Sequence, residues 1–200
     1  MKAPPFLPHR HLEEIGNLAS YWNYFEMVFD ATLWALIGIG HKPGAAITTH
    51  IGLVTKIDTL KILATYAFRK QPQRLVQLEN LIPRVDPLRV KRNTYVHHWW
   101  FYGRGSRKPK GWKISTKGTK GELKITESAV ALHEIEETTY CVWQLTLDWM
   151  CFLQATFPRY KFPWPKLSTS ETRDRNRALR NPPPTANRHK RVQPPQTSRV

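Results

Sequence analysis

The sequence predicts an all-α protein, an up-and-down bundle of four to five helices. Apolar residues recur at spacings of three and four over long stretches, which is the pattern of amphipathic helices. Glycine and proline divide these stretches into segments. Basic residues gather in two regions, an insertion and a tail. The expected organisation is an N-terminal extension (1–11), a helical domain (12–157) with an insertion (103–126), and a Pro-rich basic disordered tail (158–200).

The first two helices follow from apolar spacing and from the residues that end them. The first should run from residue 12 to Gly38 and Gly40, with Pro43 just beyond. The second should cover 45–68, before Pro72 interrupts the pattern. Its expected inward-facing residues are Ile47, Ile51, Val54, Ile57 or Leu60, Ile62 and Leu63.

The second half of the domain is expected to mix helices with one short β element. A helical run begins near Gln73, and Asp86-Pro87 is typical of a helix start, so helix should continue to about Trp100, as one kinked helix or two. Alternating apolar residues over 111–126 favour a β-hairpin, although a flexible basic loop fits the same composition. The last helix should span 128–152.

The net charge of +16 points to polyanionic partners, with RNA, DNA and an acidic membrane surface all suitable. The segment 104–124 holds eight Lys or Arg and one acid, and 166–200 holds nine and two, so each is +7. The tail has too few apolar residues to order by burial. It serves either as a solubilising tail or as a nucleic-acid-binding arm.

The sequence also predicts a cytoplasmic protein without stable membrane insertion. Cys141 and Cys151 are ten residues apart on one expected helix, about 15 Å, which is too far for a disulfide. Free cysteines suit a reducing compartment. The first ten residues contain no apolar signal segment, and the most apolar stretch, 27–39, is shorter than a bilayer span.

The segment Arg89–Tyr102 carries the side chains best suited to chemistry, in the order RVKRNTYVHHWWFY. Asn93 and His97 are neighbours one helical turn apart, whereas Arg92 and His97 lie about 140° apart, so only a long Arg side chain brings these two together. Histidine exchanges protons near neutral pH, and arginine stabilises negative charge on phosphate oxygens. RNA supplies its own 2′-hydroxyl nucleophile, so this set predicts phosphodiester cleavage without a metal or other cofactor.

The stretch R-N-T-Y-V-H resembles the motif of the HEPN superfamily, an Arg, a polar residue, and a His four to six residues after the Arg. The order of helices over 12–155 is similar too. The resemblance implies a helical bundle with metal-independent endoribonuclease activity, often in toxin–antitoxin or defence systems. Arg92 and His97 would be the catalytic pair, with Asn93 beside the Arg. It also implies a homodimer with both subunits lining one cleft, and an antitoxin or other neutralising partner.

Several alternatives accompany this hypothesis. The family often has a small residue where His98 stands, so His98 would either narrow the cleft or share the catalytic role. A metal site at His97 and His98 is disfavoured, because adjacent helical residues diverge by about 100°. The aromatic run 99–102 favours a core or interface over base stacking. A non-catalytic module that binds RNA or nucleotide, or dimerises, is the main alternative function. The residues expected to bind RNA are Arg104, Arg107, Lys108, Lys110 and Lys113.

Overall fold

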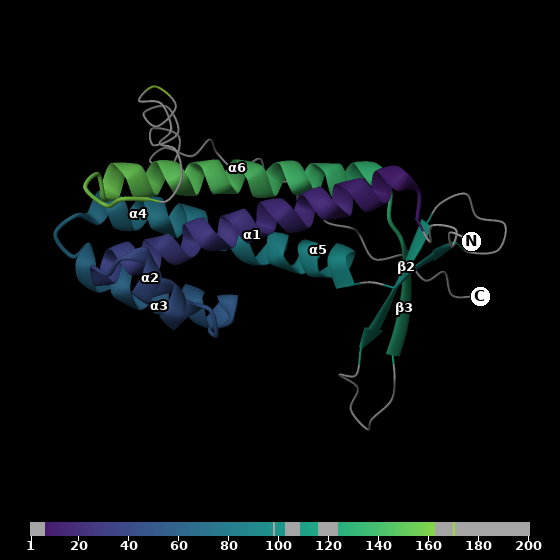
Figure 1. Cartoon of the computed structure of the whole chain (residues 1–200), viewed down its shortest axis with the longest axis horizontal. Coiled ribbons are helices and arrows are strands. Elements are labelled where there is room, and N and C mark those ends of the chain that lie inside the picture. The colour runs from purple at the N-terminus through teal and green to yellow at the C-terminus, as the bar shows by residue number, and fades with distance from the viewer. Residues whose placement is uncertain (1–6, 98, 103–108, 116–123, 163–169, 171–200) are drawn as a thin grey trace, which may run out of the picture.

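The computed structural model describes residues 7–97, 99–102, 109–115, 124–162 and 170 (Figure 1). Within these ranges the chain is mainly helical, with one 3-10 turn (η1) and a small sheet. The elements are α1 (His9–Ile37), α2 (His41–Thr48), α3 (Leu53–Ala67), α4 (Pro72–Leu81), η1 (Ile82–Arg84), α5 (Val85–His97), β1 (Trp99–Tyr102), β2 (Pro109–Ser115), β3 (Lys124–Ala129) and α6 (Leu132–Thr156).

The end of α1 confirms the predicted stop. Gly38 has φ 74°, a left-handed conformation that a residue with a Cβ rarely adopts, and the Ile39 amide donates to the Trp34 carbonyl at 2.9 Å. The predicted apolar stripe is largely buried. Phe25 and Phe29 pack against Trp149 of α6, with ring centroids 5.6 and 5.0 Å apart.

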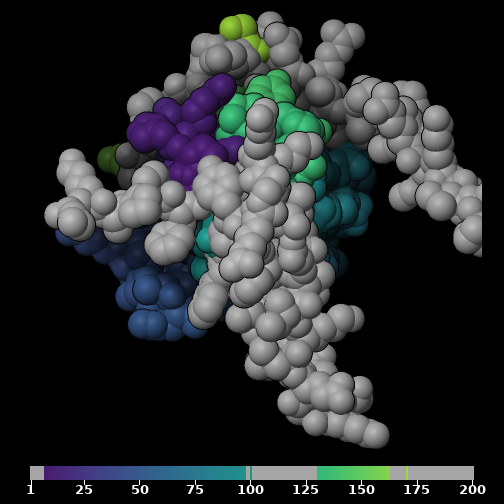
Figure 2. All heavy atoms as spheres, turned by 90° about the vertical axis from the view of Figure 1, so that its right-hand side faces the viewer, coloured from purple at the N-terminus to yellow at the C-terminus, as the bar shows by residue number. Residues whose placement is uncertain are grey.

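The long helices α1 and α6 lie side by side and run in the same direction (Figure 1). Arg10 meets Glu136 near the start of both helices, and Tyr24 meets Met150 further along. Figure 2, viewed from the sheet end, shows the start of α1 (purple) next to the start of α6 (green). The intervening α4, η1 and α5 run in the opposite direction to α6, so these long segments alternate in direction along the chain and α6 is parallel to α1.

The predicted second helix is two helices, α2 and α3, so the described residues hold six α-helices rather than four or five. Thr48 and Thr49 each bond back to a carbonyl four residues earlier, and Gly52 is extended at φ −67°, ψ 149°. The predicted inward face is also partly wrong. Ile57, Leu60 and Ala64 are buried, whereas Ile47, Val54 and Ile62 are exposed. Leu63 also packs against the core, as predicted. Nearly every turn of this stretch offers apolar residues on more than one side, so spacing alone identified only part of the buried face.

The segment from α4 to α5 returns along α6 in the opposite direction. Arg74 donates to the Ala155 carbonyl at 2.8 Å, and Arg84 pairs with Asp148 at 2.9 Å. The 3-10 turn η1 contains Pro83 and joins the two helices without a loop. The last helix starts at Leu132 rather than at 128 and ends at Thr156 rather than at 152, because β3 takes the residues before it.

The backbone of the insertion forms a three-stranded antiparallel sheet in the order β1-β2-β3. Ile114 is opposite Ile125, which agrees with the predicted hairpin, and its connecting residues 116–123 are outside the described part. β1 was not predicted, because 99 and 100 were assigned to the preceding helix; Trp99 is opposite Trp112. The sheet is therefore wider than the expected insertion, 103–126.

The ordered domain continues past its predicted end at 157. Tyr160 donates to the Ile39 carbonyl at 3.0 Å, and both Tyr160 and Phe162 pack against the core. The expected disordered tail otherwise lies outside the described residues, apart from Ser170. In the part of the chain that the structure describes, no helix combines the length and the apolar character needed to cross a membrane.

Candidate functional site

Arg92, Asn93 and His97 converge near the C-terminal end of α5. The Arg92 Nη1 atom donates to Asn93 Oδ1 at 3.0 Å and lies 3.3 Å from His97 Nε2. His97 is exposed, and Arg92 and Asn93 are half-buried. The length of the Arg side chain therefore closes the gap of five residues.

The site stands on a turn of helix that is fixed from beneath. Tyr95 faces the opposite side from His97 and is buried against α6, where a side-chain hydrogen bond joins it to Thr138. Burial raises the pKa of the Tyr95 phenol, and the bond to Thr138 opposes that rise. The Trp100 indole donates to the Tyr95 carbonyl at 3.0 Å, which satisfies an acceptor left open where the helix ends.

Within the described residues, the positive charges of Arg92 and Lys91 are not neutralised by a carboxylate. Arg89 pairs with Asp86 at 2.6 Å on the same helix, and Arg84 pairs with Asp148. Neither Lys91 nor Arg92 has a carboxylate partner in the described ranges. The Arg92 Nε atom is buried and lacks a hydrogen-bond partner there as well. A guanidinium without a carboxylate partner keeps its positive charge available to a phosphate oxygen.

Because a guanidinium only donates, a hydrogen bond between Arg92 and His97 requires the Nε2 atom of His97 to be the acceptor. In the tautomer that carries its proton on Nδ1, the Nε2 lone pair faces Arg92 at 3.3 Å, and this lone pair is the group that a general base uses.

The remaining predicted site residues are placed only in part. Lys110 and Lys113 are on β2, whose backbone is described. His98, Arg104, Arg107 and Lys108 are outside the described residues. The described residues contain no group of three His, Cys, Asp or Glu side chains that could hold a metal ion.

Two residues that support the site were not assigned this role from the sequence, namely Tyr95 and Trp100. Apolar spacing in this segment favours Val90, Val96 and Trp99 as the inward face, but in the structure Val90 is 46% exposed and Tyr95 is 6% exposed. A signal for Tyr95 is its place seven residues, or about two helical turns, after Leu88, which packs against the core. The sequence also gave Lys91 no role.

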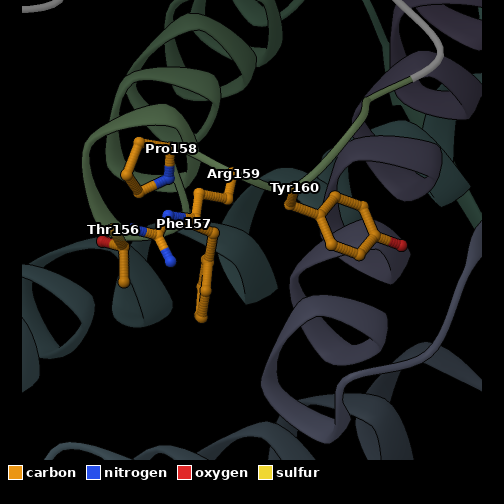
Figure 3. Close-up of a pocket in the computed structure, with 5 residues that line it drawn as sticks. All are labelled: Thr156, Phe157, Pro158, Arg159 and Tyr160. Carbon is orange, nitrogen blue, oxygen red and sulfur yellow. The ribbon is translucent and has the colours of Figure 1, made fainter.

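A hollow of about 430 Å³ lies away from this site, just after α6 (Figure 3). In the close-up, Tyr160 points away from the other labelled side chains, in keeping with its bond to Ile39. The lining residues are Thr156, Phe157, Pro158, Arg159 and Tyr160. The hollow contains one cationic group and no carboxylate, so it lacks a general acid–base pair.

Comparison with known proteins found no match among family models, curated proteins or solved structures. The HEPN resemblance therefore rests on the six residues of the motif and on the order of the helices.

Proposed function

We propose that this chain is a metal-independent endoribonuclease of the HEPN type. The observation that supports this most is the approach of the Arg92 guanidinium to His97 Nε2, at 3.3 Å, on an exposed helix end. An imidazole base and a permanent cation beside one another are what cleavage of RNA by its own 2′-hydroxyl needs. The same Nη1 atom donates to Asn93 Oδ1, which holds the guanidinium beside the imidazole.

In the proposed reaction the scissile phosphate draws Arg92 away from His97. His97 Nε2 then takes the proton of the 2′-hydroxyl as the 2′-oxygen bonds to phosphorus. Arg92 stabilises the charge on the pentacovalent phosphorane, and the bond from phosphorus to the 5′-oxygen breaks. The 5′-oxygen leaves with a proton, from His98 or from water. The products are a 2′,3′-cyclic phosphate and a 5′-hydroxyl.

The proposed substrate is captured by charge before it reaches the site. Lys91 extends the positive charge of Arg92 along α5, and Lys110 and Lys113 belong to the basic insertion that follows. Cations of this kind bind phosphates without regard to base sequence, and their contribution weakens with salt. A cytoplasmic toxin or defence role, a homodimer and a neutralising partner come with the HEPN proposal.

The test incubates the purified chain with mixed cellular RNA and EDTA and follows cleavage on a gel with end-group analysis. We expect EDTA-resistant cleavage that leaves cyclic phosphate ends, and its loss in Arg92→Ala/His97→Ala. Arg89→Ala and His41→Ala are matched controls, since both residues lie outside the converging set and His41 is exposed. The controls should cleave like the wild type. Equal cleavage by His97→Ala and the wild type would refute the proposal.

The alternative is a non-catalytic module that binds RNA or nucleotide, or dimerises. The observation in its favour is that Arg92, Asn93 and His97 already bond to one another, which is enough to close the last turn of α5. This alternative predicts salt-sensitive RNA binding without turnover. Binding would then be unchanged by His97→Ala and weakened by shortening the tail.

A further inference from the structure

The outward face of α3 presents apolar side chains that no other described residue covers. Ile62 is 72% exposed and Tyr66 is 76% exposed, on the side of the helix opposite the buried Leu60 and Ala64. A hollow of about 490 Å³ lies on this face, lined by Ile62, Thr65, Tyr66 and Arg69. A single exposed apolar residue is ordinary, but an apolar hollow on a helix face is a feature of contact surfaces.

The charges at the two ends of this hollow are complementary to each other. Asp58 stands toward the start of α3, with Lys61 at 3.6 Å, and both side chains are more than half exposed. Arg69 stands just beyond the end of α3, 5.5 Å from the centre of the Tyr66 ring. An antiparallel twofold pair of α3 helices, centred between residues 63 and 64, sets Asp58 opposite Arg69 of the second copy. Symmetry produces this ion pair twice.

We propose that a second copy of this chain docks on α3 in this antiparallel register. Ile62 then lies close to the twofold axis and enters the apolar hollow of the other copy. α3 has 15 residues, so it is about 22 Å long. A contact of that length and about 10 Å width buries less than the roughly 800 Å² per partner of a standard interface. The dimer should therefore dissociate on dilution.

This pairing involves α3 and not α5, so it is independent of the proposed ribonuclease site. It also differs from the dimer that the HEPN resemblance implies, in which the motif helices of both subunits line one cleft. Loss of cleavage would leave the α3 pairing intact, and loss of pairing would leave the chemistry of Arg92 and His97 intact.

The test is sedimentation velocity of the full chain over a series of concentrations. We expect the wild type to show a reversible association step that doubles the mass of the species present at low concentration. Ile62→Asp should lack this step, whether it is a monomer or the dimer of the HEPN proposal, and it should still fold because the side chain is 72% exposed. Val76→Asp is the matched control, a 45% exposed residue on α4, and should associate like the wild type. A wild type without this step, or an Ile62→Asp chain that keeps it, would overturn the proposal.

The register is tested by charge reversal. Asp58→Arg and Arg69→Asp should each raise the dimer dissociation constant several-fold, because each places like charges opposite one another. The double variant Asp58→Arg/Arg69→Asp should restore the wild-type constant. A double variant as weak as the single variants would overturn the antiparallel register.

Discussion

Arg92 reaches His97 across an angle that shorter side chains cannot span. Residues five positions apart diverge by about 140° on a helix, so the contact depends on the length of the Arg side chain. The same Nη1 atom of Arg92 donates to Asn93 Oδ1 and lies 3.3 Å from His97 Nε2, so Asn93 helps to hold the guanidinium beside the imidazole.

Gly44 offers a residue-scale test of packing in α2. A Cβ built on Gly44 would lie 2.4 to 2.6 Å from the Trp34 indole, which is itself held by a bond to Thr48. Gly44→Ala should therefore lower the free energy of unfolding by about 1–3 kcal/mol, as overpacking does. The measurement is the urea midpoint. Gly16→Ala is the control, because its Cβ meets nothing within 4 Å and should stabilise α1 by about 0.5–1 kcal/mol. A Gly44→Ala protein with the same urea midpoint as the wild type would contradict the close approach of Gly44 to Trp34.

His11 gives stability a pH dependence. It is 9% exposed, and neither ring nitrogen has a hydrogen-bond partner among the described residues. Burial lowers its pKa below 6.5, Glu136 of α6 opposes this, and Arg10 adds to it. The unfolded chain therefore takes up the proton first. The stabilising contribution of neutral His11 is complete above about pH 6.5 and is lost as pH falls from there toward the lowered native pKa.

His11→Leu separates this effect from the other histidines. The urea midpoint of the wild type should fall more steeply between about pH 7.5 and pH 5.5 than that of His11→Leu, which has no proton to take up at this position. Identical pH profiles for the two proteins would mean that the native state accommodates a charged His11.

The candidate site could be predicted from the sequence only as a set of residue types. The motif R-N-T-Y-V-H named Arg92, Asn93 and His97, and the structure brings these three together. Helical spacing did not reveal that Tyr95 anchors the helix, because Tyr95 is buried by packing of α5 against α6, whose residues are more than 35 positions away in the sequence. Nor did it reveal that Trp100 caps α5 from a strand.

At the scale of elements, predictions of helices and strands were confirmed where local sequence signals were strong. They were wrong where contacts between distant parts of the chain determine where a helix breaks or which of its faces is buried. The spacing in α1 and Gly38 fixed a long helix and its end, and alternation predicted the pairing of β2 with β3. The break between α2 and α3 depends on threonine back-bonding and on an extended Gly52. The buried face of α3 depends on α1, which no pattern within α3 encodes.

A partly buried ion pair connects α1 with α3. Lys56 lies 2.7 Å from Asp30, and their side chains are 9% and 14% exposed. Lys56→Met should cost about 3–5 kcal/mol of unfolding free energy, because it leaves the carboxylate buried without its cation. The measurement is again urea unfolding. Lys61→Met removes an exposed pair and should change stability by less than about 0.5 kcal/mol.

The pH dependence of the stability of Lys56→Met tests whether its loss of unfolding free energy comes from the unpaired charge of Asp30. Burial already raises the pKa of Asp30, and Lys56 opposes that rise. Without Lys56 the native carboxyl takes up a proton more readily than the unfolded one, so the deficit should shrink as pH falls. Asp30→Asn/Lys56→Met should recover part of the loss at neutral pH. A deficit that is the same at every pH would mean that the loss comes from packing of the Lys56 chain rather than from charge.

At the scale of the whole molecule, charge is divided between two parts of the chain. α1 holds four acids and one Arg, and α6 holds four acids and no Lys or Arg, so this pair of helices carries −7 in a chain of +16. The positive charge of the chain therefore lies outside the α1–α6 pair, in α5, the two basic segments and other parts of the sequence. Five glutamates lie in or near the first turns of α1 and α6. Because the two helices are parallel, these first turns are at the same end of the molecule, where Figure 2 shows the starts of both helices next to each other.

The salt dependence of the proposed RNA binding separates the contributions of the two basic segments. For single strands, the logarithm of the binding constant should fall with the logarithm of salt by about 0.7 for each phosphate neutralised. A chain ending at Phe162, where the described packing against the core ends, loses nine Lys or Arg and two acids. Its slope should be shallower by about 0.7 for every lost cation that touches RNA. Lys110→Ala/Lys113→Ala should lower the slope by up to about 1.4.

Fluorescence anisotropy with labelled single-stranded RNA measures all three slopes. If shortening leaves the slope unchanged while the double variant reduces it, the insertion captures RNA and the tail is solubilising. The reverse result would make the tail the nucleic-acid-binding arm.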